Sequence, residues 1–160
     1  FTSNNIRYTI MSFEEIWHEA QKDSSLGVDP EQLEQWLTQI PTEQYHYLEG
    51  QTTRTIHQTK MNVLQEHEQK EKMIEKLQMY KYVDDIQDVR LGSFVRWVKH
   101  DKKASLTNGG LVMKISFTDK GTYIVTKIGK KVTHFGLNQN HTFQKLTSEE
   151  WIVLMANEHS

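Results

Sequence analysis

The sequence predicts an α+β protein, with a helical N-terminal arm over residues 1–81 and a small antiparallel β-barrel-like domain with a C-terminal capping helix over residues 82–160. Two observations support this division. Apolar residues recur at helical spacing up to about residue 80, whereas after Tyr82 they alternate with polar residues. The charge changes at the same place, because residues 1–81 carry 8 Lys/Arg and 13 Asp/Glu, and residues 82–146 carry 11 Lys/Arg and 5 Asp.

Two short helices are expected at the start of the arm. Ser12 and Glu15 form a capping-box pattern, which predicts a helix over roughly residues 12–22. Asp29 and Pro30 are typical of a second helix start, since Asp caps helices and Pro is tolerated at the first helical position. The apolar face of this second helix consists of Leu33, Trp36, Leu37 and Ile40.

A single long helix is expected over residues 42–80, where no proline occurs and Gly50 is the only glycine. Lys60, His67 and Lys70 interrupt its heptad positions, so a two-stranded coiled coil is not expected. Apolar positions are sparse between residues 49 and 72. The helix would therefore either bury one stripe on its own protein or act as an arm that packs on a partner, and we favour the partner.

The β-domain is expected to contain short strands over residues 91–98, 111–117, 122–128, 132–137 and 141–145. The sequences Asp119-Lys120-Gly121 and Gly129-Lys130-Lys131 are typical of tight turns. A flat sheet of this size would expose two edges, so the closely spaced antiparallel strands favour a small barrel or a rolled meander. Thr147 and Glu150 form a second capping box, which opens a terminal helix expected to cap the barrel.

Composition excludes several classes of site. The chain has no cysteine, which rules out disulfides, a thiolate nucleophile and cysteine-based zinc sites, so a reducing intracellular compartment is expected. No run approaches the ~18 apolar residues of a membrane span, so no membrane partner is expected. The first residues lack the pattern of a secretory signal. Met11 is a candidate natural start, although processing or an incomplete sequence would explain Phe1 equally well.

No residue pattern indicates catalysis. No glycine-rich phosphate loop occurs. Among the histidines of the expected long helix, none has another histidine three or four residues away, and His67 with Glu71 supplies only two metal ligands. Asp84 and Asp85 are adjacent, so on a strand they would point to opposite faces and could not act together on one bond. We therefore expect no enzymatic activity, no cofactor and no metal.

The basic β-domain is the most informative feature, because its cationic residues are interleaved with aromatic ones. Three interpretations stay open. The aromatics form the core while the lysines solvate the domain; exposed aromatics stack the bases of single-stranded nucleic acid in a cationic groove; or the lysines dock an acidic protein surface. The candidate binding surface consists of Arg96, Trp97, Lys99, Lys102, Lys103, Lys114, Lys127, Lys130 and Lys131.

Four short segments carry a resemblance to a known family. They are YVDDI at residues 82–86, VRLGSFVRWV at residues 89–98, LTNGG at residues 106–110 and FQKL at residues 143–146. The segment over roughly residues 80–150 resembles one in uncharacterised proteins of large DNA viruses of algae and amoebae. The resemblance implies a viral setting and a place in the particle, and it implies no catalytic residues. Independently of it, Gly109 and Gly110 can supply positive φ before the next strand.

These observations together favour a non-catalytic structural or assembly protein associated with a virion. It would dock other proteins through the long helix and the basic β-domain. The alternative is a small-barrel module that binds nucleic acid, and a salt titration separates the two because binding to phosphates weakens steeply with added salt. The oligomeric state is left open.

Overall fold

The structure is a computed structural model that describes residues 30–158, which form two compact units. The helical unit contains residues 30–53 and 147–158, and the sheet unit contains residues 54–146. The expected helix over residues 12–22 lies outside the described residues. The division differs from the expected boundary between residues 81 and 82, because the terminal helix packs with the N-terminal helices and the segment over residues 54–81 belongs with the sheet.

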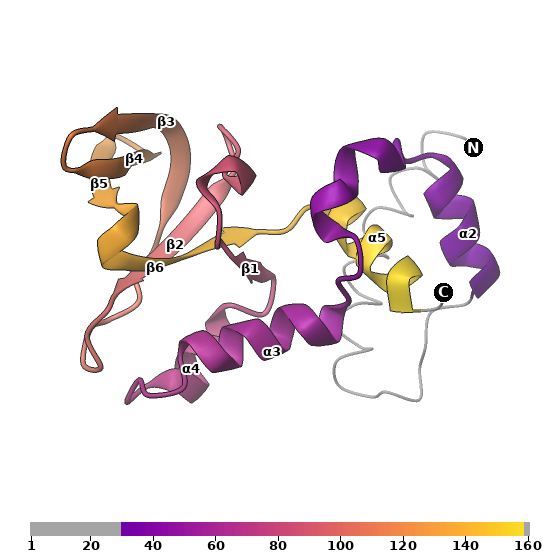
Figure 1. The fold of residues 1–160 in the computed structure, drawn as a ribbon, viewed down its shortest axis with the longest axis horizontal. Coiled ribbons are helices and arrows are strands. Elements are labelled where there is room, and N and C mark those ends of the chain that lie inside the picture. Colours follow the sequence, from indigo (N-terminus) through magenta and orange to yellow (C-terminus); the bar gives the residue numbers. More distant parts are fainter. Residues whose placement is uncertain (1–29, 159–160) are drawn as a thin grey trace. The chain divides into compact units, whose positions relative to one another are not determined.

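The helical unit consists of α2 (Pro30–Thr38), the 3-10 helix η1 (Thr42–Leu48) and α5 (Ser148–Glu158) (Figure 1). Consecutive residues of α5 from Glu150 to Met155 are all buried, as in a helix at the centre of a core. α5 packs against α2 and η1 and belongs to their unit, not to the sheet unit that it was expected to cap. The buried apolar residues of this unit include Leu33, Trp36, Ile40, Leu48, Trp151 and Leu154.

The expected capping box at the start of α5 is confirmed. The Thr147 N–H donates to Glu150 Oε1 at 2.9 Å, and the Glu150 N–H donates to Thr147 Oγ1 at 3.1 Å. The Tyr47 hydroxyl donates to Glu150 Oε2 at 2.8 Å, and Asn157 Nδ2 donates to the Leu48 carbonyl at 2.9 Å. Side-chain hydrogen bonds therefore connect η1 to both ends of α5.

The sheet unit contains six antiparallel strands in the order β1-β6-β2-β3-β4-β5 (Figure 1). The five expected strands are present, and β1 was missed. The sheet has two edges, β1 and β5, so the expected barrel closure is wrong. The strands are β1 (Tyr80–Tyr82), β2 (Phe94–Lys99), β3 (Gly110–Thr118), β4 (Gly121–Ile128), β5 (Lys131–Gly136) and β6 (Asn140–Lys145); the 3-10 turns are η2 (Ile86–Asp88) and η3 (Leu137–Gln139).

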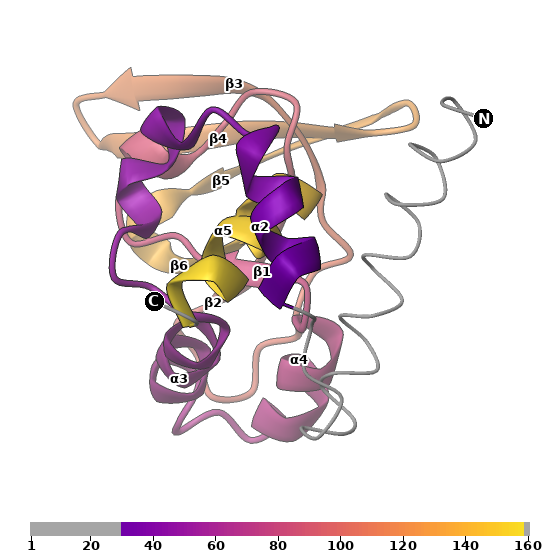
Figure 2. The ribbon, with the colours of Figure 1, turned by 90° about the vertical axis from the view of Figure 1, so that its right-hand side faces the viewer.

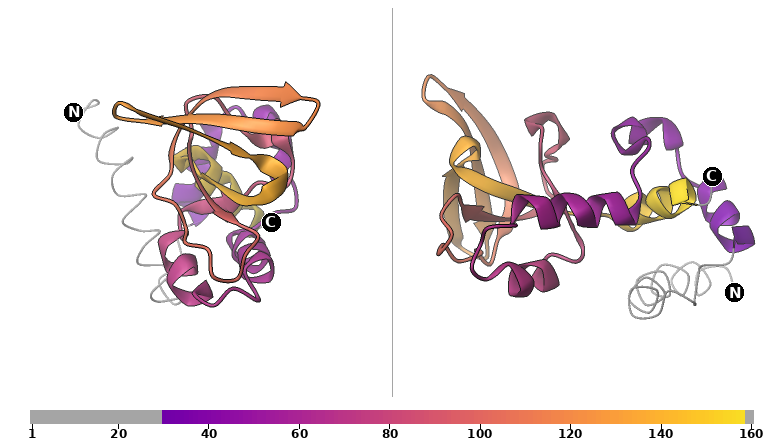
Figure 3. Two further views of the ribbon diagram at one scale, coloured as in Figure 1. Left: turned by 90° about the vertical axis from the view of Figure 1, so that its left-hand side faces the viewer. Right: turned by 60° about the horizontal axis from the view of Figure 1, so that its bottom comes forward.

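The inner face of the sheet encloses the first hydrophobic core of this unit. The indole of Trp97 on β2 stacks on the ring of Phe135 on β5, with centroids 4.0 Å apart and planes at 11°. These two strands are separated by β3 and β4 in the sheet, so the sheet rolls over its own inner face without closing (Figure 3). The inner core contains Val83, Val89, Val95, Trp97, Val112, Ile124 and Phe135.

Helices α3 (Thr53–Val63) and α4 (Lys70–Lys76) cover the outer face of the sheet at β1, β6 and β2. They lie side by side, on the side of the sheet unit away from β3 and β4 (Figure 2). The second core forms beneath them and contains Leu64, Met73, Leu77, Tyr80, Val98 and Phe143. The two helices thus bury the outer face of β1, β6 and β2, which the rolled strands do not enclose.

The expected continuous helix over residues 42–80 is wrong, because the segment breaks twice. Gly50 adopts a φ of 75° after η1, and a turn over residues 64–69 separates α3 from α4. Leu64 and Met73 are nine residues apart, so at about 100° per residue they would lie on opposite sides of one straight helix. The turn lets both side chains reach the same core, where each is almost completely buried.

Gly109 of the LTNGG motif has a structural requirement for glycine. Its φ is 88°, and a Cβ added there would lie 2.3 Å from the carbonyl oxygen of Val95. Thr107 in the same loop makes three hydrogen bonds to β2. Its carbonyl accepts from Arg96 Nε at 2.8 Å, its Oγ1 accepts from the Trp97 N–H at 3.1 Å, and its N–H donates to the Trp97 carbonyl at 3.0 Å. The expected positive φ is confirmed at Gly109, and the motif serves to hold the β2–β3 loop against β2.

Candidate functional site

The outer face covered by α3 and α4 on β2 continues across β3, β4 and β5, where neither α3 nor α4 covers it. Directly opposed residues of antiparallel strands point to the same side of a sheet. Phe94 packs on the second core and opposes Leu111, which opposes Lys127, which opposes Val132. Leu111 is 45% exposed and Val132 is 63% exposed. The strands thus present a lysine with one aliphatic side chain on each side of it.

A second row lies beside the first, on the far side of a register shift at Met113. In this row Lys114 opposes Val125, and Val125 opposes His134. The polar and apolar positions alternate along both rows, and neither row contains a carboxylate. We call this surface the open face and define it as Leu111, Lys114, Val125, Lys127, Val132 and His134.

The surroundings of the open face are cationic. No Asp or Glu occurs between Asp119 and Glu149, whereas five lysines occur in that interval. Lys130 and Lys131 lie at the β4–β5 turn, directly after the strand that carries Lys127. A surface with one sign of charge attracts partners of the opposite charge and raises their association rate.

The sequence-predicted surface is divided between places that cannot act as one site. Arg96 and Trp97 are neighbours on β2 and point to opposite faces of the sheet. Trp97 is 8% exposed and stacks on Phe135 in the inner core, while half-buried Arg96 bonds to the β2–β3 loop. One of the three interpretations of the sequence placed the aromatic residues in the core and the lysines in solvent. For Trp97, Phe135 and Phe143 this core interpretation is confirmed.

The seven predicted lysines fall into two groups. Lys114 and Lys127 belong to the open face, and Lys130 and Lys131 adjoin it at the β4–β5 turn. The other group lies at the carboxyl end of β2 and in the loop that follows, and consists of Lys99, Lys102 and Lys103. β3 pairs with the opposite end of β2, at Phe94 and Val95, so the second group is not part of the open face.

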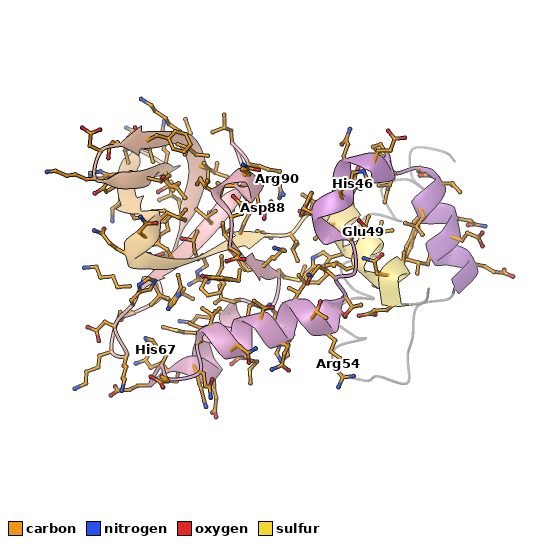
Figure 4. All side chains as sticks on the ribbon, in the orientation of Figure 1. His46, Glu49, Arg54, His67, Asp88 and Arg90 are labelled. Atoms are coloured by element: carbon orange, nitrogen blue, oxygen red, sulfur yellow. The ribbon has the colours of Figure 1, made fainter. Side chains whose placement is uncertain are left out.

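Lys99 and Lys102 of that second group line a pocket of about 400 Å³ between the α3–α4 turn, the start of the β2–β3 loop and β6. Three histidines line it. The rings of His100 and His141 have centroids 4.2 Å apart. His67 lies at the α3–α4 turn (Figure 4), with Nε2 2.7 Å from the Ala104 carbonyl, while Nδ1 accepts from the Gln69 N–H at 3.0 Å. These bonds assign the proton of His67 to Nε2.

The pocket favours the neutral form of His141. Burial lowers the pKa of His141, and the nearby imidazoles of His100 and His67 lower it further. Its Nδ1 atom is buried and has no hydrogen-bond partner. Within residues 30–158, no three His, Cys, Asp or Glu side chains are placed to hold a metal ion. Sequence reasoning missed this cluster because the three histidines are far apart in the chain.

Lys60 is a second group that the sequence did not single out as functional. It is 2% exposed, and its Nζ donates to the Leu77 carbonyl at 2.7 Å and to the Gln78 carbonyl at 3.4 Å. Burial lowers its pKa from 10.5 to about 8. Because the ammonium bonds to backbone carbonyls at the end of α4, its role is to cap that helix.

Comparison of the chain with protein-family models, with curated proteins and with solved structures finds no match. Of the helices in the part of the chain that the structure describes, none combines the length and the apolar content that crossing a bilayer requires.

Proposed function

We propose that this protein is a non-catalytic docking module of a larger protein assembly, and that its open face binds an acidic segment of another protein chain. The observation that carries the proposal is the alternation of exposed aliphatic and basic side chains on the open face, with no carboxylate among them. Contact with the aliphatic positions would supply affinity, and the lysines would select an acidic partner.

Exposed aliphatic side chains on a sheet face favour a partner surface. Leu111 and Val132 flank Lys127 in one row, and Val125 lies in the next. Complete burial of a Leu or Val side chain is worth roughly 1.5–3 kcal/mol. Leu111 and Val132 are 45% and 63% exposed, so covering the remainder of each is worth about half of that. Together with charge-assisted hydrogen bonds from Lys114 and Lys127, these contacts are of the size that a weak, specific peptide interaction needs.

The same surface is poorly suited to the alternative, single-stranded nucleic acid. Such sites combine cationic grooves with aromatic platforms on which bases stack. Trp97, Phe135 and Phe143 lie in the two cores. Phe117 is 73% exposed, but it opposes Thr122 near the tip of the β3–β4 hairpin, on the side of the sheet away from the open face. Tyr123 lies on the same side as the open face, but its ring is half-buried and meets the ring of His134 edge-on, with centroids 6.5 Å apart. The positions directly between the lysines are aliphatic.

A selection of random twelve-residue peptides displayed on phage, against the immobilised full chain, tests this function. We expect recovered peptides rich in Asp, Glu and aliphatic residues. The affinity of a recovered peptide, measured by fluorescence anisotropy, should fall at least tenfold for Lys127→Gln and for Leu111→Ser. Lys99→Gln is the matched control, because Lys99 is exposed at the end of β2, outside the open face, and should leave the affinity unchanged.

Two outcomes contradict the proposal. One is a selection that yields no peptide, or peptides without acidic residues. The other is tighter binding of a twenty-nucleotide oligothymidine than of any recovered peptide, with an affinity that drops steeply between 50 and 200 mM salt. That second result would assign the lysines to phosphate contacts instead.

Residues 80–150 resemble a segment of viral proteins. On this basis we propose that the larger assembly is a virus particle. Mass spectrometry of purified particles from infected source cells tests it. We expect peptides of this chain in stoichiometric amounts with particle proteins. Their absence from particles, with the chain present in the infected cell, would contradict the virion setting and leave the docking function in place.

A further inference from the structure

The two edges of the sheet differ in how they are protected. β1 has three residues, and short edge strands are one way in which proteins avoid unwanted strand pairing. β5 has six residues, contains no proline and pairs with β4 in a regular register without a bulge. An edge of this length and regularity is a template for a further strand.

The register identifies which backbone groups of β5 are free. Ile128 and Lys131 close a two-residue turn, so they form a pair that exchanges both backbone hydrogen bonds, and such pairs alternate along an antiparallel ladder. Thr133 is then also bonded to β4, which agrees with its carbonyl accepting from Thr126 Oγ1 at 3.2 Å. The N–H and C=O groups of Val132 and His134 therefore point away from β4.

We propose that an extended acidic segment of the partner adds to β5 as a seventh strand, with its backbone bonded to Val132 and His134. This inference rests on the proposed function and specifies its binding mode. Alternate side chains of the added strand would extend the open face beside Val132 and His134. The opposite side chains would lie beside Lys131.

Charge argues for an acidic partner strand over a second copy of this chain. β4, β5 and their turn carry Lys127, Lys130 and Lys131, with no Asp or Glu between Asp119 and Glu149. Pairing β5 with β5 of another copy would bring two such lysine groups to one sheet, and like charges close together across strands are unfavourable. Acidic residues in an added strand would instead neutralise them.

The experiment uses the full chain and a phage-selected acidic peptide, with His134→Pro as the test variant. Proline removes the outward N–H and is tolerated on edge strands, where no ladder bond is lost. We expect His134→Pro to weaken peptide binding at least tenfold. His134→Val is the matched comparison, because it removes the same imidazole but keeps the N–H, and the proline variant should bind at least threefold more weakly than the valine variant.

A second measurement does not depend on the proline variant remaining folded. Amide hydrogen exchange of the unsubstituted chain, followed by NMR, should show at least tenfold slower exchange of the Val132 and His134 N–H groups when peptide is bound. The inference is overturned if the peptide binds and these two amides exchange unchanged.

The failures of the two proposals are distinguishable. Loss of binding in Lys127→Gln with full binding in His134→Pro overturns strand addition and leaves docking on the open face intact. Absence of binding by every selected peptide overturns both. A concentration-dependent dimer in analytical ultracentrifugation that His134→Pro abolishes would overturn the choice of occupant, since the edge would then pair with a second copy.

Discussion

The two halves of the sheet's outer face differ in what covers them. On β1, β6 and β2 the face is covered by α3 and α4, and Val98 and Phe143 beneath them are almost completely buried. On β3, β4 and β5 the same face carries the lysines and half-exposed aliphatics of the open face. Both halves belong to one continuous sheet, so the difference is in side chains and cover, not in backbone.

This difference separates positions that stabilise the fold from positions that are available for binding. In the covered half, apolar side chains are inside a core and their loss leaves a cavity. In the open half, aliphatic side chains remain partly in water, where their contribution to folding is small. Substitutions in the covered half should therefore mainly lower the stability of the fold. Substitutions in the open half should mainly weaken the binding of a partner.

The largest expected effect is in the covered half. Phe143→Ala should lower the free energy of unfolding by about 3–5 kcal/mol, because the ring lies fully buried between β6 and the helices. Urea unfolding followed by circular dichroism measures it. A loss below about 1 kcal/mol would mean that α3 and α4 contribute little to the sheet unit, and it would remove the comparison between the halves.

The periodicity of the sequence was sufficient to predict the strands from residue 91 onward and the capping box of α5, because both signals are local. It failed where distant contacts decide the structure. The segment over residues 42–80 has helix-forming residues throughout, but Leu64 and Met73 reach one core only when the helix breaks between them. β1 was missed because its three residues become a strand only by pairing with β6.

The candidate site was predicted only in part, for a related reason. Counting lysines identified Lys114 and Lys127 but could not assign their faces, since a register shift at Met113 places both on the same side of the sheet. Arg96 and Trp97 were included because they are adjacent and of a suitable chemical type, although neighbours on a strand point apart. The aliphatic positions of the open face gave no signal, because an exposed Leu or Val is indistinguishable in sequence from a buried one.

The second prediction concerns Lys60 in the covered half. Its pKa of about 8 in the folded chain lies below the ordinary 10.5, so between these values the unfolded chain binds more protons and stability rises with pH. Between pH 7 and 9.5 this residue should add about 2 kcal/mol to the free energy of unfolding. Urea unfolding at both pH values measures the gain.

Lys60→Met is the control for that measurement. It fills a similar volume without a titrating group, so its stability should change little between pH 7 and 9.5. If the stability of the variant rose equally with pH, the pH dependence would come from other groups. That result would contradict the proposal that burial lowers the pKa of Lys60.

A smaller effect is expected on acidification, from the histidine pocket at the border of the covered half. Since the pKa of His141 is lowered, its unfolded form binds a proton first as the pH falls, and stability decreases below about pH 6.5. The titratable groups that face it are His67, His100 and Tyr82, and the charged groups nearby are Lys99, Lys102, Glu66 and Asp101.

Amide hydrogen exchange localises this acid effect, after correction for the intrinsic dependence of exchange on pH. The Leu64 amide, at the α3–α4 turn, should lose protection between pH 7 and 5, while the Val125 amide of the open half should not. His141→Phe removes the titrating ring and should reduce the loss. Equal loss of protection at both amides would indicate global unfolding instead of a local response of the covered half.

The smallest effect on stability is expected in the open half. Val132→Thr keeps a β-branched side chain on β5 and changes only a group that is already largely in water, so the free energy of unfolding should change by less than about 0.5 kcal/mol. Anisotropy with a phage-selected acidic peptide should nevertheless show weaker binding, because the substituted methyl contacts the partner. A substitution that leaves folding unchanged and reduces binding is what separates the open half from the covered half. If Val132→Thr instead destabilised the fold as Phe143→Ala does, the aliphatic residues of the open face would be part of a core, and they would not be available to a partner.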